Sequence, residues 1–268
     1  MKSDKRILLN VRVEAARRAA RELLERFHVE HPDAIEVETI AWHVGRLIVK
    51  EGGLDCAEGR LVATTTRGGV IRVVRSSHAG RRRFTIAHEI GHWLLHQGAM
   101  IDRTDSKASF TVWNDSSEEA EANAFAAELL MPEFLLRPRF SGNPPSMKLM
   151  DSLAEEFRTS VIATVFQYWE YTNEPVAVVL SEGWDMRFFR PFKAGWPQIR
   201  FGDIHEHSAA GERLANKAPD VGQMVRSPAY AWLEGFEYKR DVDIKEDSRY
   251  LDYYDRTITL LWIDDPLD

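Results

Sequence analysis

Two histidines and the glutamate beside one of them are the residues of this chain with the clearest chemical meaning. His88, Glu89 and His92 form the pattern H-E-x-x-H. On a helix, residues four apart lie on one face about one turn from each other, so both imidazoles can bind a single metal ion. Glu89 then projects close enough to reach a water molecule at that ion. The spacing therefore predicts zinc-dependent hydrolysis, with the two histidines as ligands.

The residues around this motif favour the helix that the chemistry needs. Thr85 is a suitable N-cap, which would place Glu89 near the helix start, where the helix dipole favours a carboxylate. Gly91 costs about 1 kcal/mol relative to alanine in a helix, so we expect another backbone or the metal site to lie close to it. Apolar residues recur at intervals of three and four beside the histidine face, at Phe84, Ala87, Gly91, Leu94 and Leu95.

His96 extends the series to H-E-x-x-H-x-x-x-H, but the distance argues against it as a third ligand. His88 and His96 are eight residues apart, which is about 12 Å along a helix. Zinc–nitrogen bonds are about 2 Å long, so one ion cannot bind both residues. We expect His96 to make a hydrogen bond near the end of the helix instead.

A second predicted helix, from Ser116 to Pro132, offers the third ligand. It opens with serine caps, carries acidic residues in its first turn and stops at the proline. Spacing alone leaves three candidate ligands, Glu118, Glu119 and Glu121. Glu119 and Asn123 are four residues apart and point the same way. An asparagine at that position can form a hydrogen bond with a ligating histidine and fix its tautomer.

The blocks R-F-T-I-A-H-E-I-G-H-W-L-L-H and E-A-E-A-N-A-F-A-A-E-L-L-M-P resemble the ImmA/IrrE family of metallopeptidases, in their order and separation as well as in their residues. The resemblance runs from about residue 37 to residue 131. It implies a gluzincin-type endopeptidase with His88, His92 and Glu119 as Zn²⁺ ligands, Glu89 as the catalytic general base and Asn123 beside a ligand. It also implies a substrate class, namely transcriptional repressors with helix-turn-helix domains, whose cleavage derepresses stress-response or mobile-element genes.

Composition limits the remaining possibilities. The chain has 268 residues, 44% of them hydrophobic, which is enough for a full core. The single cysteine, Cys56, excludes an internal disulfide and fits a reducing cytoplasm. The sequence shows no signal-peptide pattern and no run approaching 18 apolar residues, so we expect a cytoplasmic protein with no membrane partner. The net charge of -7 argues against general nucleic-acid binding.

The periodicity along the chain predicts an α+β fold, in which a helical zinc-metallopeptidase domain with a small β-sheet comes first. Amphipathic helices are expected at residues 9–28 and after Pro32. Extended runs at 60–66 and 70–74 are joined by Gly68 and Gly69, a typical hairpin signal. The run Arg81–Arg83 is expected to be solvated and to precede the histidine helix. Residues 102–117 are expected to form a loop between the two metal-binding helices.

Gly142-Asn143-Pro144-Pro145 marks the clearest boundary. It predicts a metallopeptidase domain at 1–141, a helix-turn-helix-like segment at 142–172 and a mixed α/β region at 173–268, with strands at 176–180 and 257–263. Residues 161–172 contain no Lys or Arg. Because phosphate contacts supply most of the non-specific affinity for DNA, this helix favours packing or substrate docking over direct DNA binding.

An alternative function from another class is a non-catalytic regulator, in which the metal site is structural and the C-terminal part binds DNA or a partner protein. Glu89 favours catalysis over this alternative, because a structural zinc site has no need of a general base.

Overall fold

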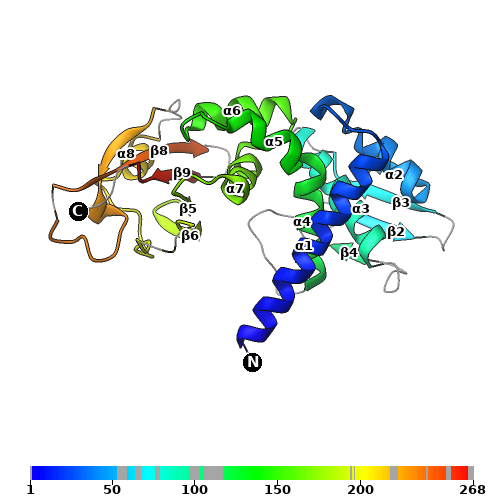
Figure 1. Ribbon diagram of the computed structural model, residues 1–268, viewed down its shortest axis with the longest axis horizontal. Coiled ribbons are helices and arrows are strands. Elements are labelled where there is room, and N and C mark those ends of the chain that lie inside the picture. The colour runs from blue at the N-terminus through cyan, green and yellow to red at the C-terminus, as the bar shows by residue number, and fades with distance from the viewer. Residues whose placement is uncertain are drawn as a thin grey trace. The chain divides into compact units, whose positions relative to one another are not determined.

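The computed structural model describes residues 2–52, 59–63, 68–75, 79–96, 103–105, 117–193, 195, 197–217, 223–239, 241–251 and 255–264. Within these residues the chain forms eight α-helices and two β-sheets, which confirms the predicted α+β fold class (Figure 1). Contacts divide the chain into two compact units. Unit 1 comprises residues 1–138 and 154–163, and unit 2 comprises residues 139–153 and 164–268. The three-part division inferred from the sequence stays a prediction.

Unit 1 is built on three long helices, α1 (Lys2–Arg26), α3 (Ala79–Leu95) and α4 (Ser117–Leu130). α4 packs along both α1 and α3 (Figure 1). The alanines of α4 are buried, and their small side chains let the helices approach closely. The predicted first helix is longer than expected, since it begins at Lys2 instead of residue 9. A one-turn 3₁₀ helix (Pro32–Ala34) and α2 (Val37–Gly45) follow α1.

A four-stranded sheet with the order β1-β3-β2-β4 completes unit 1. β1 (Leu47–Glu51) runs parallel to β3 (Gly69–Val73), while β2 (Gly59–Ala63) runs antiparallel to both β3 and β4 (Arg103–Asp105). The pairing of β2 with β3 confirms the two predicted antiparallel strands, but Gly69, expected in the turn, lies in β3 and pairs with Ala63. Residues 64–67 of the connection lie outside the described residues. β4 lies in the segment predicted to be a loop, and residues 106–116 of that segment are also outside the described part.

α3 begins six residues before the expected cap, so two expectations about its start were wrong. Thr85 lies inside the helix, where its hydroxyl donates to the carbonyl oxygen of Arg81 at 3.1 Å. The arginine run also lies within the helix. Arg82 forms ion pairs with glutamates of α2 and β1, and Arg83 is buried and donates to the carbonyl of Ile35 at 3.0 Å. Burial lowers the pKa of Arg83 to about 10. These long side chains reach neighbouring elements that the local sequence does not reveal.

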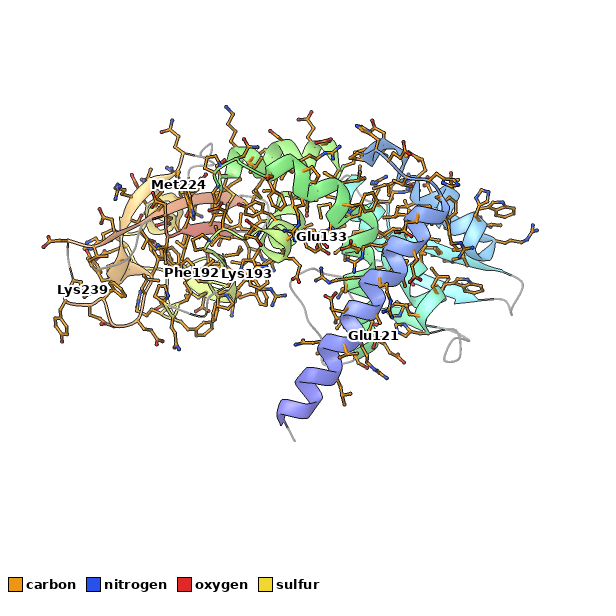
Figure 2. The ribbon with its side chains drawn as sticks, in the orientation of Figure 1. Glu121, Glu133, Phe192, Lys193, Met224 and Lys239 are labelled. Carbon is orange, nitrogen blue, oxygen red and sulfur yellow. The ribbon has the colours of Figure 1, made fainter. Side chains whose placement is uncertain are left out.

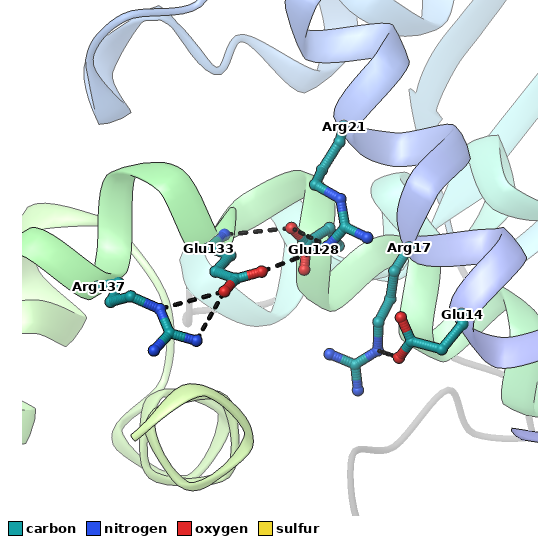
Figure 3. A network of polar contacts seen from close by, with 6 residues as sticks. All are labelled: Glu14, Arg17, Arg21, Glu128, Glu133 and Arg137. Carbon is teal, nitrogen blue, oxygen red and sulfur yellow. Dashed lines mark hydrogen bonds and ion pairs between the residues drawn. The ribbon is translucent and has the colours of Figure 1, made fainter. Parts of the chain in front are cut away.

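A buried carboxylate fixes the C-terminal end of α4 (Figure 3). Glu128 accepts hydrogen bonds from Arg21 of α1 at 3.2 Å and from the backbone N–H of Glu133 at 3.1 Å. Glu133 opens α5 (Glu133–Phe140), and its carboxylate accepts two bonds from Arg137. Hydrogen bonds to a charged group are stronger than neutral ones, so this network holds α4 against α1 and α5.

Unit 2 contains an antiparallel five-stranded sheet with the order β6-β5-β9-β8-β7. The two strands predicted from the sequence are β5 (Val176–Glu182) and β9 (Arg256–Trp262), which pair directly with each other. The other strands are β6 (Asp185–Arg190), β7 (Val225–Pro228) and β8 (Asp243–Leu251). The helices are α6 (Met147–Glu156), α7 (Val161–Tyr171), α8 (Ala209–Asn216) and a 3₁₀ turn (Ala229–Ala231). Of α6 and α7, residues 154–163 group with unit 1.

No helix in the described part of the chain is both long enough and apolar enough to span a lipid bilayer.

Candidate metal centre

α3 presents two histidine rings to each other across one helical turn. The Nε2 atoms of His88 and His92 lie 3.0 Å apart, and the two ring centroids are separated by 4.6 Å. Both side chains have 0% exposure to solvent. The two imidazoles therefore lie on one helix face, as the spacing predicted, and their Nε2 atoms approach each other.

α4 brings a carboxylate to the same point. Oε2 of Glu119 lies 3.4 Å from Nε2 of His88, and Oε1 lies 3.3 Å from Nε2 of His92. The close approach of the two helices depends on Gly91, because a Cβ atom there would lie 3.1 Å from the ring of Phe125 and 3.3 Å from the Cα of Ala122. This contact confirms that another backbone lies close to Gly91.

The structure distinguishes among the three glutamates that the spacing left open. Within the described residues, the one group of three side chains arranged to hold a metal ion is His88, His92 and Glu119. Glu121 instead lies beside His96, with its Oε2 atom 3.2 Å from Nε2 of that ring. Glu118, in the first turn of α4, is not part of the group.

The three side chains fit a zinc ion. Ligand atoms at the usual zinc–nitrogen and zinc–oxygen distances of about 2.0–2.2 Å from a tetrahedral ion lie roughly 3.3–3.6 Å from each other. The observed separations of 3.0, 3.3 and 3.4 Å are close to that range. Two imidazoles and a carboxylate are also a ligand set that zinc accepts in catalytic sites, where a fourth position is left for water or substrate.

The electrostatics keep the carboxylate ionised. Burial by itself would raise the pKa of Glu119, but hydrogen bonds and charge interactions with His88 and His92 outweigh burial and hold that pKa well below its usual range. The side chain of Glu119 is 23% exposed, whereas both histidines are fully enclosed. Of the three side chains, only that of Glu119 is therefore partly open to solvent.

Glu89 follows His88 directly on α3 and is 1% exposed. It lies well inside the helix and not near its start, because α3 begins at Ala79. A carboxylate in such an enclosed position interacts strongly with nearby charges, since the effective dielectric constant is low there. This environment suits a base that handles a proton beside a metal ion.

The remaining ring nitrogens also have partners. Nδ1 of His88 lies 3.0 Å from Oδ1 of Asn123, which places the asparagine beside a histidine as its spacing from Glu119 indicated. Nδ1 of His92 lies 3.0 Å from Nδ1 of His96. The distance argument correctly predicted a hydrogen bond for His96, but it did not identify the partners. The four-residue spacing from His92 to His96 is the signal that could have done so.

Comparison with known proteins agrees with this geometry. Residues 53–167 match a peptidase family model described as the IrrE N-terminal-like domain, which confirms the resemblance seen in the two sequence blocks. A solved structure described as a Mycobacterium tuberculosis transcriptional regulator is similar, with a TM-score of 0.55 and 14% sequence identity. The match covers 94% of this chain and 76% of that one, and at this identity it indicates a shared fold. No curated protein matches the sequence.

Proposed function

Because residues 53–167 match the peptidase family model described as the IrrE N-terminal-like domain, we propose that the chain is a zinc-dependent endopeptidase. The observation that carries the proposal is the convergence of His88, His92 and Glu119, whose ligand atoms lie 3.0–3.4 Å apart. Glu89, buried next to His88, supplies the base that hydrolysis requires.

The chain's own residues account for the proton transfers of peptide hydrolysis. When bound, zinc supplies a Lewis acid that polarises a carbonyl and lowers the pKa of water towards neutrality. The carboxylate of Glu89 takes a proton from the attacking water as the water oxygen forms its bond to the carbonyl carbon. Glu89 then delivers that proton to the leaving nitrogen as the carbon–nitrogen bond breaks. Asn123 holds the ring of His88 in one orientation.

The proposed substrate is a transcriptional repressor with a helix-turn-helix domain. Cleavage of such a repressor in the cytoplasm would derepress stress-response or mobile-element genes. The family resemblance supports this substrate class, whereas the ligand geometry supports metal-assisted hydrolysis without specifying the substrate. α7 contains no Lys or Arg, so the proposal assigns no direct DNA binding to it.

The experiment that tests the proposal compares the wild-type chain with Glu89→Gln, both loaded with zinc. Each is incubated with purified helix-turn-helix repressors, starting with any that is encoded beside its gene, and the products are identified by mass spectrometry. Glu89→Gln is expected to slow cleavage about 10²–10⁴-fold, the usual contribution of a general base, while its zinc content stays unchanged. Glu25→Gln, an exposed change on α1, is the matched control. Cleavage by Glu89→Gln at the wild-type rate would show that the mechanism is wrong.

A second candidate is a non-catalytic regulator with a structural metal site. The observation that favours it is the shared fold with a protein described as a transcriptional regulator. Purified protein that cleaves no repressor, yet binds the promoter DNA of its own gene, would favour this candidate over the peptidase.

A further inference from the structure

A chain of polar contacts leads away from the metal centre through His92. Nδ1 of His92 lies 3.0 Å from Nδ1 of His96, and Nε2 of His96 lies 3.2 Å from Oε2 of Glu121. The three side chains are enclosed, with exposed fractions of 0%, 6% and 13%. His96 and Glu121 are not ligands in the cluster described above, so their arrangement calls for a different role.

The contacts admit one consistent set of tautomers. A neutral imidazole has one N–H donor and one nitrogen lone pair, whereas an ionised carboxylate only accepts. If Nε2 of His92 directs its lone pair towards a metal ion, its Nδ1–H donates to Nδ1 of His96. His96 then carries its hydrogen on Nε2 and donates to Glu121. Every contact is satisfied in this state, and the opposite tautomer of His92 would point an N–H at the metal position.

We propose that His96 and Glu121 are positioning residues for zinc binding, which hold His92 in the tautomer that can act as a ligand. This inference rests on the zinc site of the proposed function. A carboxylate at the end of the contact chain also makes His92 a more basic ligand, as partners of ligating histidines do in other zinc sites. His96 therefore contributes to the metal site without contacting the metal.

The Nδ1 atoms of the two proposed histidine ligands have different hydrogen-bonding partners. His88 has the neutral amide of Asn123 as its partner at 3.0 Å, while the partner of His92 is an imidazole backed by a carboxylate. Glu121 lies on α4 at the side that faces α1 (Figure 2), where Arg12 approaches its Oε1 atom at 3.3 Å. Arg12 is 58% exposed, so its ion pair with Glu121 contributes little. The tautomer of His92 is thus fixed by the two less exposed residues, His96 and Glu121.

The first test measures zinc affinity of the full chain by competition with a chromophoric chelator. Glu121→Leu removes the acceptor of His96 and is expected to weaken zinc binding about 10–100-fold, the usual effect of losing such a partner. Glu121→Gln keeps an oxygen that can accept from His96 and should weaken binding less. Glu118→Gln, on the same helix three residues earlier, is the matched control and should bind zinc as the wild type does.

A second measurement separates positioning from general damage to the fold. Nitrogen-15 NMR of labelled histidines in the folded protein should show the hydrogen of His92 on Nδ1 and that of His96 on Nε2. In Glu121→Leu, His96 should lose its single tautomer. The double variant His96→Leu/Glu121→Leu should bind zinc no more weakly than His96→Leu, because Glu121 affects His92 only through its hydrogen bond with His96.

The outcomes distinguish this inference from the function on which it rests. Wild-type affinity in both Glu121 variants, or losses that simply add in the double variant, would overturn the positioning role while leaving the zinc site intact. Wild-type protein that binds no zinc would overturn the zinc site, and the positioning role with it.

Discussion

Glu119 in unit 1 and Glu246 in unit 2 are both carboxylates with several polar partners, but the partners differ in kind. Glu246 is fully buried on β8 and accepts hydrogen bonds from four donors, which are the backbone N–H groups of Ala209 and Ala210, the indole of Trp232 and the hydroxyl of Ser248. It thereby caps the N-terminus of α8. Glu119 is partly exposed, and its neighbours are imidazole nitrogens, which can offer lone pairs.

This difference separates a structural carboxylate from one that is placed to bind a metal ion. The four donors around Glu246 occupy the roughly four lone-pair sites of a carboxylate and leave it no capacity for a metal ion. Partners with lone pairs of their own converge on a shared cation instead. Burial alone does not make the distinction, because Glu246 is the more deeply buried of the two.

The largest effect is expected from removing the structural carboxylate. Glu246→Ala leaves two backbone N–H groups and an indole N–H buried without their acceptor, which should lower the free energy of unfolding of unit 2 by about 3–5 kcal/mol. Denaturant titration with tryptophan fluorescence measures this loss. Zinc affinity, measured on the folded variant, should stay within about twofold of wild type. A large loss of zinc affinity would contradict the distinction between the two carboxylates.

The converse change is Glu119→Gln, which removes the charge of the proposed metal ligand with little change in shape. Zinc affinity should fall more than about 100-fold, beyond the loss expected for a residue that only supports a ligand. That loss corresponds to about 2.8 kcal/mol of binding free energy. Chelator competition gives the affinity, and denaturation without zinc should show a smaller change than Glu246→Ala. Retention of wild-type affinity would exclude Glu119 as a ligand.

A smaller effect should follow from separating the helices that carry the ligands. Gly91→Ala adds a Cβ atom 3.1 Å from Phe125 and 3.3 Å from the Cα of Ala122, so α3 and α4 must move apart by a few tenths of an ångström. We expect zinc affinity to fall about 3–10-fold, or roughly 1 kcal/mol. Gly52→Ala is the control, since a Cβ atom there meets no atom within 4 Å. Equal affinities in the two variants would show that the helix separation does not set the ligand geometry.

The sequence predicted the parts of this molecule that depend on local spacing. The positions of His88 and His92 on one helix face, the hairpin formed by β2 and β3, and the strands β5 and β9 all follow from periodicity. Contacts between distant segments were not predictable in this way. The spacing within α4 could not separate Glu119 from Glu121, because the choice depends on how α4 packs against α3.

The start of α3 shows the same limit. Arg83 is buried by its contact with Ile35, which lies 48 positions away. The local run of three arginines favours a solvated segment, and only the tertiary contact reverses that expectation. The role of Glu246 was likewise invisible, since its donors come from α8 and from the 3₁₀ turn near Trp232.

Asp247, the neighbour of Glu246, gives the smallest expected effect and a test of what burial costs when a carboxylate is not fully satisfied. Its Oδ2 atom accepts from the backbone N–H of Met147 at 2.7 Å, and its side chain is enclosed. Burial raises the pKa of Asp247 and outweighs the hydrogen bond from Met147 and the positive charge of Arg249.

The sign of the pH dependence follows from that shift. The native state holds the proton of Asp247 more tightly than the unfolded chain, so the stability of unit 2 falls as the pH rises from about 3.9, the ordinary aspartate pKa, through the raised value. Asp247→Asn keeps an acceptor for Met147 and has no charge to bury, so it should lack this decline. Denaturant titrations of both proteins between about pH 4 and pH 8 measure the difference in slope. Parallel curves would show that folding does not raise the pKa of Asp247.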